Sequence, residues 1–63
     1  MNVHLIKERK DITSKAASVK ELLEELKINH TTVLVARNGK LVTLQAQIKK
    51  QDEIIIYPVI SGG

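Results

Sequence analysis

Hydrophobic and polar residues alternate at the beginning of the 63-residue chain, a pattern typical of a β-strand. In residues 1–6, Val3 and Leu5 are expected to face inward while the residues between them face water, as in a strand open to solvent on one side. We expect a short second strand at residues 10–13. The residues from 7 to 17 contain no clear turn signal.

A helix is predicted to begin at Ser18. Ser18 and Glu21 have the S-x-x-E spacing in which a hydroxyl and a carboxylate cap the first backbone amides of a helix. Four apolar residues follow at the spacing of one helical stripe: Val19, Leu22, Leu23 and Leu26. We expect the helix to run to about Lys27, and Asn29 to leave it in a left-handed conformation.

A β-hairpin is predicted around Asn38-Gly39, because these two residues favour the positive φ angles of a type I′ turn and lie between apolar, β-branched runs. The runs cover residues 32–37 and 40–44. A two-residue loop pairs Arg37 with Lys40, Ala36 with Leu41, Val35 with Val42, and Val33 with Leu44. We assign the face that carries the four residues of the last two pairs to the core.

The last third of the chain is polar until a final apolar strand. Residues 45–53 are expected to form a connection that Ile48 anchors and that Gln51-Asp52 turns. Residues 54–57 are apolar on both faces, which predicts either a central strand or an exposed apolar patch. Pro58 is expected to end regular pairing because it lacks a backbone donor. One amphipathic helix needs one sheet face, so we predict a two-layer α+β fold with a four- or five-stranded mixed sheet.

Composition excludes several classes of function. A chain this short buries only about 60% of its unfolded surface, which leaves little room for a substrate cleft. The absence of cysteine excludes disulfides, thiolate metal sites and a cysteine nucleophile, and it suits the cytoplasm, where we expect the protein to reside. No apolar run approaches the roughly 20 residues of a membrane span, and residues 1–9 do not form a signal-peptide core. We therefore expect no membrane partner.

The charged and polar side chains offer no reaction centre. Lysine and arginine number 10 against 7 acidic residues, but the cations at residues 7–10 and 49–50 are mixed with acids, and Tyr57 is the single aromatic residue. We therefore expect a solvated surface that steers an acidic partner, and no nucleic-acid binding. His4 and His30 lack a third ligand, so no metal site is predicted. Without a phosphate loop or a nucleophile beside a base, we expect a non-enzyme with no bound cofactor.

Three segments together resemble the ThiS/MoaD sulfur-carrier family, which has the β-grasp or ubiquitin-like fold. They are the capped helix of residues 18–26, the Asn-Gly hairpin of residues 33–42, and the end of the chain from Asp52, which closes with Pro-Val-Ile-Ser-Gly-Gly. The resemblance implies a β-grasp domain over residues 1–58 and a flexible C-terminal tail over residues 59–63. The sequence departs from the family at the first hairpin, which has no turn signal, and at Ile55, where relatives often carry a charge.

The resemblance implies that the working group is the C-terminal carboxylate of Gly63. In the family, an adenylating enzyme related to ubiquitin-activating enzymes joins this carboxylate to AMP from ATP, and a sulfur donor then converts it to a thiocarboxylate. Sulfur is delivered to an acceptor in thiazole, molybdopterin or tRNA synthesis. Gly62 and Ser61 would thread the partner's channel, and glycine suits this because it lacks a Cβ atom.

Residues of the last strand and of the beginning of the tail are expected to bind the partner, with simple core or edge packing as the alternative. They are Ile55, Tyr57, Pro58, Val59 and Ile60. We expect a monomer that awaits its activating enzyme and its sulfur-acceptor synthase or target proteins. Two other functions stay open: a small ubiquitin-like modifier joined to lysines through Gly63, and a plain interaction module in which Gly62 and Gly63 have no role.

Overall fold

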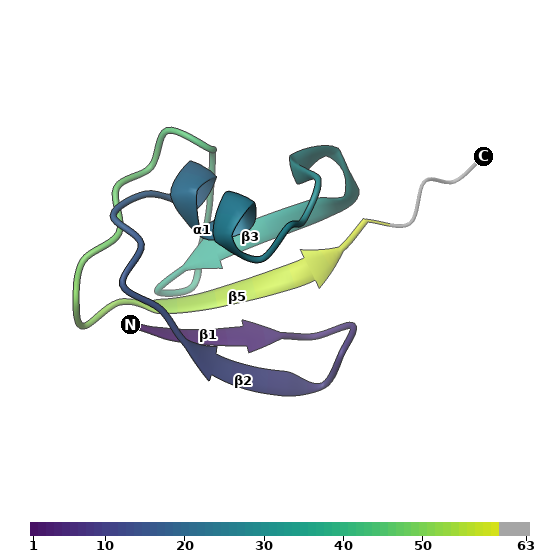
Figure 1. The fold of residues 1–63 in the computed structure, drawn as a ribbon, viewed down its shortest axis with the longest axis horizontal. Coiled ribbons are helices and arrows are strands. Elements are labelled where there is room, and N and C mark those ends of the chain that lie inside the picture. Colours follow the sequence, from purple (N-terminus) through teal and green to yellow (C-terminus); the bar gives the residue numbers. More distant parts are fainter. Residues whose placement is uncertain (60–63) are drawn as a thin grey trace.

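A computed structural model describes residues 1–59, which form one mixed sheet of five strands and one α-helix (Figure 1). In chain order the elements are β1 (Asn2–Leu5), β2 (Lys10–Thr13), α1 (Val19–Glu25), the 3₁₀ helix η1 (His30–Thr32), β3 (Val33–Arg37), β4 (Lys40–Val42) and β5 (Glu53–Pro58). The strand order is β2-β1-β5-β3-β4, with β1 and β5 parallel and the other neighbours antiparallel. The predicted two-layer α+β architecture is confirmed.

The core lies between α1 and one face of the sheet. The predicted stripe of α1 faces the strands, and Leu22 has no exposed surface. Ile54, in the central strand β5, is also fully buried, and Ile48 anchors the β4–β5 connection as expected. The buried apolar residues that pack together are Val3, Leu5, Val19, Leu22, Leu23, Val35, Ile48, Ile54 and Ile56. Their burial is the main stabilising contribution in a chain without disulfides.

The start of α1 is confirmed at Ser18. The Ser18 hydroxyl accepts a hydrogen bond from the Glu21 N–H at 3.2 Å, and the Glu21 carboxylate accepts from the N–H of Ala17 at 2.8 Å. The end of the helix is predicted wrongly. Helix α1 ends at Glu25, two residues before the expected end at Lys27.

The residue in the left-handed conformation after α1 is Lys27, with φ 57°, and not Asn29. The N–H of Ile28 donates to the Leu23 carbonyl at 2.9 Å and that of Lys27 to the Glu24 carbonyl at 3.1 Å, the two bonds of a Schellman cap. This early cap lets Ile28 pack against the core. Asn29 instead caps η1, where its side-chain oxygen accepts from the Thr31 N–H at 3.0 Å.

The second hairpin has the predicted turn. Asn38 and Gly39 have φ angles of 51° and 87°, as a type I′ turn requires. The observed register confirms the pairs Arg37–Lys40, Ala36–Leu41 and Val35–Val42. The expected pair of Val33 and Leu44 does not form, because β4 ends at Val42 and the Leu44 carbonyl accepts from the Lys20 N–H of α1 at 3.1 Å.

The first hairpin, β1–β2, forms although its sequence lacks a turn signal. Its turn uses Arg9 with φ 53°, a left-handed conformation that non-glycine residues seldom adopt, and the Arg9 N–H donates to the Ile6 carbonyl at 3.2 Å. The expected strands at both sides of the turn are confirmed.

Strand β5 is the central strand and ends at Pro58, as expected, with one further backbone hydrogen bond beyond it. Pro58 lies opposite Val33, and the N–H of Val59 donates to the Thr32 carbonyl at 3.0 Å. In this register a backbone N–H at position 58 would face β1, and β1 ends at Leu5. The missing donor therefore costs no hydrogen bond with β3.

Candidate functional site

The chain end proposed from the sequence begins where β5 ends. Gly63, Gly62, Ser61 and Ile60 lie outside the described residues, so the structure places the site up to Val59. Val59 is 40% exposed, and its backbone is tied to Thr32. Because β5 is hydrogen-bonded to β1 and to β3, the last described residues leave the body from the middle of the sheet (Figure 1).

The face of the sheet away from α1 is apolar across its three strands β4, β3 and β5. Directly paired residues lie on the same face of a sheet, and Leu41 pairs with Ala36, which pairs with Ile55, while Leu34 pairs with Tyr57. We call these five residues the outer face. Leu41 is 66% exposed, Leu34 49% and Tyr57 38%. Contiguous exposed apolar residues of this kind mark interaction surfaces.

The structure brings two of the expected partner-binding residues, Ile55 and Tyr57, onto the outer face. Ile55 is half-buried, and Pro58 and Val59 lie exposed at the end of the same strand. Sequence reasoning missed the apolar residues that β3 and β4 add: Leu34, Ala36 and Leu41. The signal was present, since the alternation that places the hairpin valines inward requires their neighbours to point outward.

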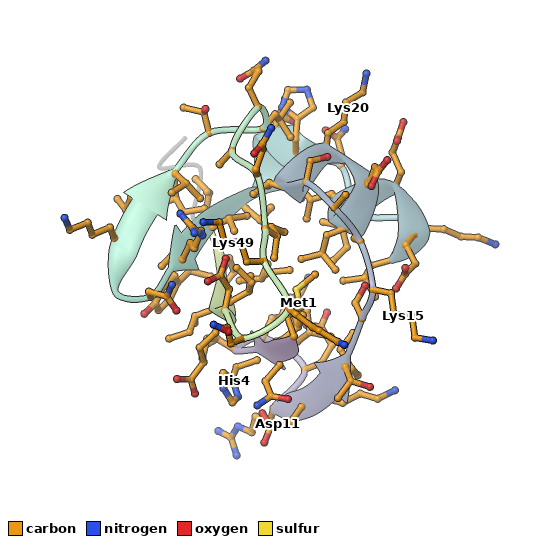
Figure 2. All side chains as sticks on the ribbon, turned by 90° about the vertical axis from the view of Figure 1, so that its left-hand side faces the viewer. Met1, His4, Asp11, Lys15, Lys20 and Lys49 are labelled. Carbon is orange, nitrogen blue, oxygen red and sulfur yellow. The ribbon has the colours of Figure 1, made fainter. Side chains whose placement is uncertain are left out.

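A polar cluster continues the outer face toward the opposite edge of the sheet. His4 lies beside Ile55 in the register, and its Nδ1 is 2.7 Å from Oδ1 of Asp11 on β2. Its Nε2 is 2.9 Å from Oε1 of Glu53 on β5. The hydrogen bonds to Asp11 and then to Glu53 raise the pKa of His4 above its ordinary value, because both ring nitrogens donate only in the protonated form. Figure 2 shows His4 beside Asp11.

A buried carboxylate ties the β3–β4 hairpin to the start of β5. Asp52 is 6% exposed and accepts hydrogen bonds from Nε of Arg37, from the Lys49 N–H at 2.7 Å and from the Asn38 amide at 2.9 Å. These donors, with Arg37 first, hold the pKa of Asp52 well below its ordinary value. The Asn38 side chain also accepts from the Glu53 N–H at 2.9 Å. The sequence predicted Asp52 only as a turn residue, so this network was missed.

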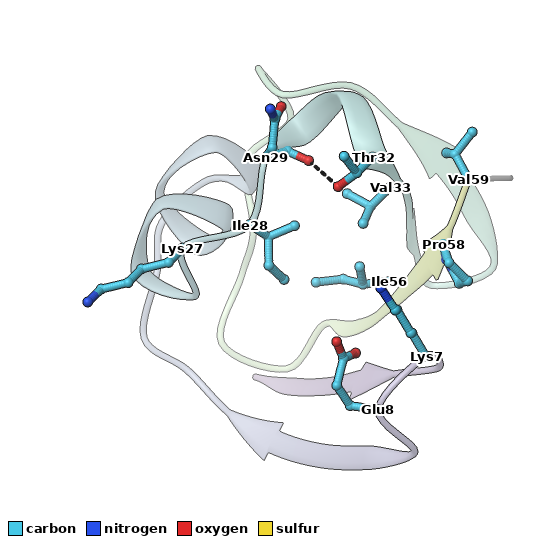
Figure 3. Close-up of a pocket in the computed structure, with 10 residues that line it drawn as sticks. All are labelled: Lys7, Glu8, Lys27, Ile28, Asn29, Thr32, Val33, Ile56, Pro58 and Val59. Carbon is cyan, nitrogen blue, oxygen red and sulfur yellow. Dashed lines mark hydrogen bonds between the residues drawn. The ribbon is translucent and has the colours of Figure 1, made fainter. Parts of the chain in front are cut away.

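A hollow of about 320 Å³ lies beside the end of β5 (Figure 3). Ile28 and Ile56 face one another in its middle, and Lys7 and Glu8 stand at its rim. Within residues 1–59, no three histidine, aspartate or glutamate side chains are grouped so that they could hold a metal ion. The same part of the chain contains no helix long and apolar enough to cross a membrane. The described geometry can present the outer face and the exposed end of β5 to a partner.

Comparison with known proteins identifies the family. The model of the ThiS family matches residues 3–63. The sulfur carrier protein TtuB of Thermus thermophilus is 37% identical over 57 residues, which cover 89% of this chain and 88% of the relative.

Solved structures with the same fold cover essentially the whole chain. The Amycolatopsis orientalis BexX/CysO complex contains a chain with a TM-score of 0.71 and 22% identity, covering 98% of both chains. A chain in the complex of subunits 1 and 2 of the Helicobacter pylori molybdopterin-converting factor has a TM-score of 0.70 and 24% identity, covering both chains fully. The thiamine biosynthesis protein ThiS of Geobacter metallireducens has a TM-score of 0.67 and 27% identity, again over both full chains. These likenesses confirm the β-grasp fold, and the family match over residues 3–63 shows that this chain belongs to the ThiS family.

Proposed function

We propose that this protein is a sulfur carrier whose Gly63 carboxylate becomes a thiocarboxylate on a partner enzyme. The observation that carries the proposal is that the ThiS family match continues to Gly63, the last residue of the chain. The name of the Thermus relative, a sulfur carrier protein, supports it. In this proposal the protein is a substrate and carrier, and catalysis belongs to the partner.

Two steps load the sulfur. A carboxylate oxygen of Gly63 attacks the α-phosphate of ATP in the partner's active site, which forms an acyl-adenylate and releases pyrophosphate. A sulfide ion then attacks the acyl carbon and AMP leaves, which gives the thiocarboxylate directly. Where the donor is a protein persulfide, its terminal sulfur attacks, AMP leaves, and the resulting acyl disulfide is cleaved by a second thiol, which forms a disulfide with the donor and releases the thiocarboxylate. Residues 59–63 act as the tail that reaches this site. Glycine at position 63 leaves no Cβ atom to obstruct a narrow channel, and its activated acyl group cannot racemise.

The outer face docks on the adenylating partner while the tail enters its active site. Ile55 and Tyr57 belong to this face, and Pro58 and Val59 lie exposed beside it at the end of β5. Ile60, the next residue of the sequence, is proposed to contact the same partner. Because the tail starts at the end of β5, a partner that covers the outer face also receives the tail. Two of the similar structures are complexes with another protein, which supports a protein as the partner.

The test is the intact mass of the chain after incubation with ATP, sulfide and each adenylating enzyme of the ubiquitin-activating type from the same organism. We expect the mass increase that follows from replacing one oxygen by sulfur, located in the C-terminal peptide. A variant without Gly63 should show no exchange, and Glu24→Gln, a change at an exposed residue of α1 outside the outer face, should exchange normally. The proposal fails if no enzyme produces the exchange, or if the product is an isopeptide bond between Gly63 and a lysine.

The sulfur acceptor is a precursor of the thiamine thiazole, of molybdopterin or of a thiolated tRNA. Adding the purified thiocarboxylate form to the candidate synthases of the organism tests each acceptor separately. We expect the C-terminal carboxylate mass to return only with the cognate synthase and its acceptor.

A further inference from the structure

The end of the molecule opposite Pro58, where β5 ends, contains a basic hollow that the proposed sulfur chemistry does not use. Its volume is about 870 Å³, and a second hollow of about 700 Å³ continues it. Both are lined by Ala17, Ile48 and Lys49. Figure 2 looks directly at this end, with Lys15, Lys20 and Lys49 around Met1. We call the two hollows together the basic hollow.

The fold gathers lysines here that are far apart in the sequence. Lys15 and Lys20 lie before and within α1, whereas Lys49 and Lys50 belong to the β4–β5 connection. All four are exposed, and no salt bridge within residues 1–59 involves any of them. The lining contains four lysines and two glutamates, so it accounts for two of the three net positive charges of the chain.

The glutamates of the basic hollow are already engaged. Glu25 accepts hydrogen bonds from the hydroxyl of Ser14 at 3.0 and 3.2 Å, and Glu21 accepts from the N–H of Ala17 at 2.8 Å. These neutral donors hold the two carboxylates in place but leave their charge, so the four lysines give the lining a net charge of two positive units, which attracts negative charge.

The segments that line the basic hollow are held in fixed positions. The N–H of Ile48 donates to the Ala17 carbonyl at 2.9 Å, and that of Val19 donates to the Ala46 carbonyl at 3.0 Å. Ser14 is buried, and its N–H donates to the Met1 carbonyl at 3.1 Å. A surface held in this way needs little ordering when it binds a partner, which favours affinity.

The lining distinguishes among possible anionic ligands. Its apolar part is aliphatic, formed by Met1, Ala16, Ala17, Leu44 and Ile48. Nucleic acids bind single-stranded segments by stacking bases on aromatic side chains, and Tyr57, the one aromatic residue of the chain, lies on the outer face. An aliphatic side chain flanked by carboxylates fits both the apolar floor and the lysine rim.

From this arrangement we infer that the basic hollow is a second docking surface, which binds an acidic segment of a partner protein with an aliphatic side chain seated among Ala16, Ala17 and Ile48. The surface lies at the opposite end of the molecule from Pro58, where β5 ends, so both ends can be occupied at once. A partner could hold the carrier here while the outer face and Gly63 engage the adenylating enzyme.

The test is a nuclear magnetic resonance titration of the ¹⁵N-labelled full chain with a short synthetic peptide of glutamates around one leucine. We expect saturable shifts at the amides of the basic hollow. The variant Lys15→Gln/Lys49→Gln should bind about tenfold more weakly, because two attractive charges are lost and exposed pairs contribute modestly. The variant Lys7→Gln/Lys40→Gln is the control: it removes the same charge elsewhere and should bind within about twofold of the native chain.

Two further ligands separate the alternatives. A peptide with serine in place of leucine should bind more weakly, and an oligouridine of similar length and charge should bind more weakly than the leucine peptide. The inference is overturned by equal weakening in both variants, by shifts located on the outer face, by equal binding of the serine peptide, or by tighter binding of the oligouridine. Because Gly63 takes no part in this titration, its result is independent of the thiocarboxylate test.

Discussion

If the outer face is a docking surface, the effect of replacing Leu41 on partner binding can be predicted quantitatively. Leu41 lies on the edge strand β4, is 66% exposed and pairs with Ala36 on the side away from the core. Replacing it with alanine removes apolar surface that contributes little to folding but that a docked partner covers. We therefore expect Leu41→Ala to weaken binding to the adenylating enzyme without a matching loss of stability.

The exposed fraction sets the size of the effect. Complete burial of a leucine side chain contributes about 1.5–3 kcal/mol, and docking can bury at most the two thirds of Leu41 that folding leaves in water. Leu41→Ala should therefore weaken binding by about 1–2 kcal/mol, or roughly five- to thirtyfold in Kd. The stability change of an exposed substitution should be within about 0.5 kcal/mol.

Leu26→Ala is the matched control, since the same substitution is made on the opposite side of the sheet. Leu26 is half-buried and packs against the core, so this variant should lose about 1–2 kcal/mol of stability, less than the cost at a fully buried leucine. The chain as a whole has about 3–9 kcal/mol to lose, so the variant stays folded at low temperature.

Calorimetric titration against the adenylating enzyme and thermal unfolding followed by circular dichroism measure the two effects. We expect opposite patterns: Leu41→Ala changes Kd and keeps Tm, whereas Leu26→Ala lowers Tm and keeps Kd. If Leu41→Ala binds like the native chain, or if its Tm falls as far as that of Leu26→Ala, the outer face is not the docking surface.

Three further predictions concern the polar groups and the turn. The pKa of His4 is raised, so its bridge to Asp11 and Glu53 stabilises the fold below pH 6.5 and is lost as pH rises through the raised value. The Tm difference between native chain and His4→Gln should thus shrink with rising pH, and a difference that grows contradicts this. The pKa of Asp52 is lowered, so the stability that its carboxylate contributes is fully present above pH 3.8 and is lost as the pH falls through the lowered value. The Tm of Asp52→Asn should therefore fall less steeply in acid than the Tm of the native chain. An equally steep fall in both proteins contradicts this prediction. In Gly39→Ala the added Cβ atom meets no atom within 4 Å, but alanine must adopt the φ of 87°. The free energy of unfolding, measured in urea, should therefore fall by about 1–2 kcal/mol. An unchanged value would show that the turn has changed type.

The sequence predicted well those features that neighbouring residues determine. The Ser18 cap and the Asn38-Gly39 turn depend on side chains and φ preferences within a few positions. The end of α1 was missed because the packing of Ile28 against the core decided it, and that packing is a tertiary contact. The Asp52 network was missed for a similar reason, since it requires the hairpin and the start of β5 to be neighbours.

In the candidate site, too, residues close in the sequence were predicted and residues brought together by the fold were missed. Ile55 and Tyr57 were expected because they lie in an apolar run just before the chain end. Leu34 and Leu41 join them only when β3 is known to pair with β5, a pairing between segments distant in the sequence. The basic hollow likewise depends on loops that meet only in the folded chain.

The central position of β5 has a consequence for biosynthesis. A nascent chain interrupted before Glu53 contains the two hairpins β1–β2 and β3–β4, but it lacks the strand that joins them into one sheet. Because that strand follows both hairpins in the sequence, cooperative folding of the sheet can begin only after residues 53–58 have left the ribosome. Products interrupted before this strand would lack a complete sheet and would remain open to proteases.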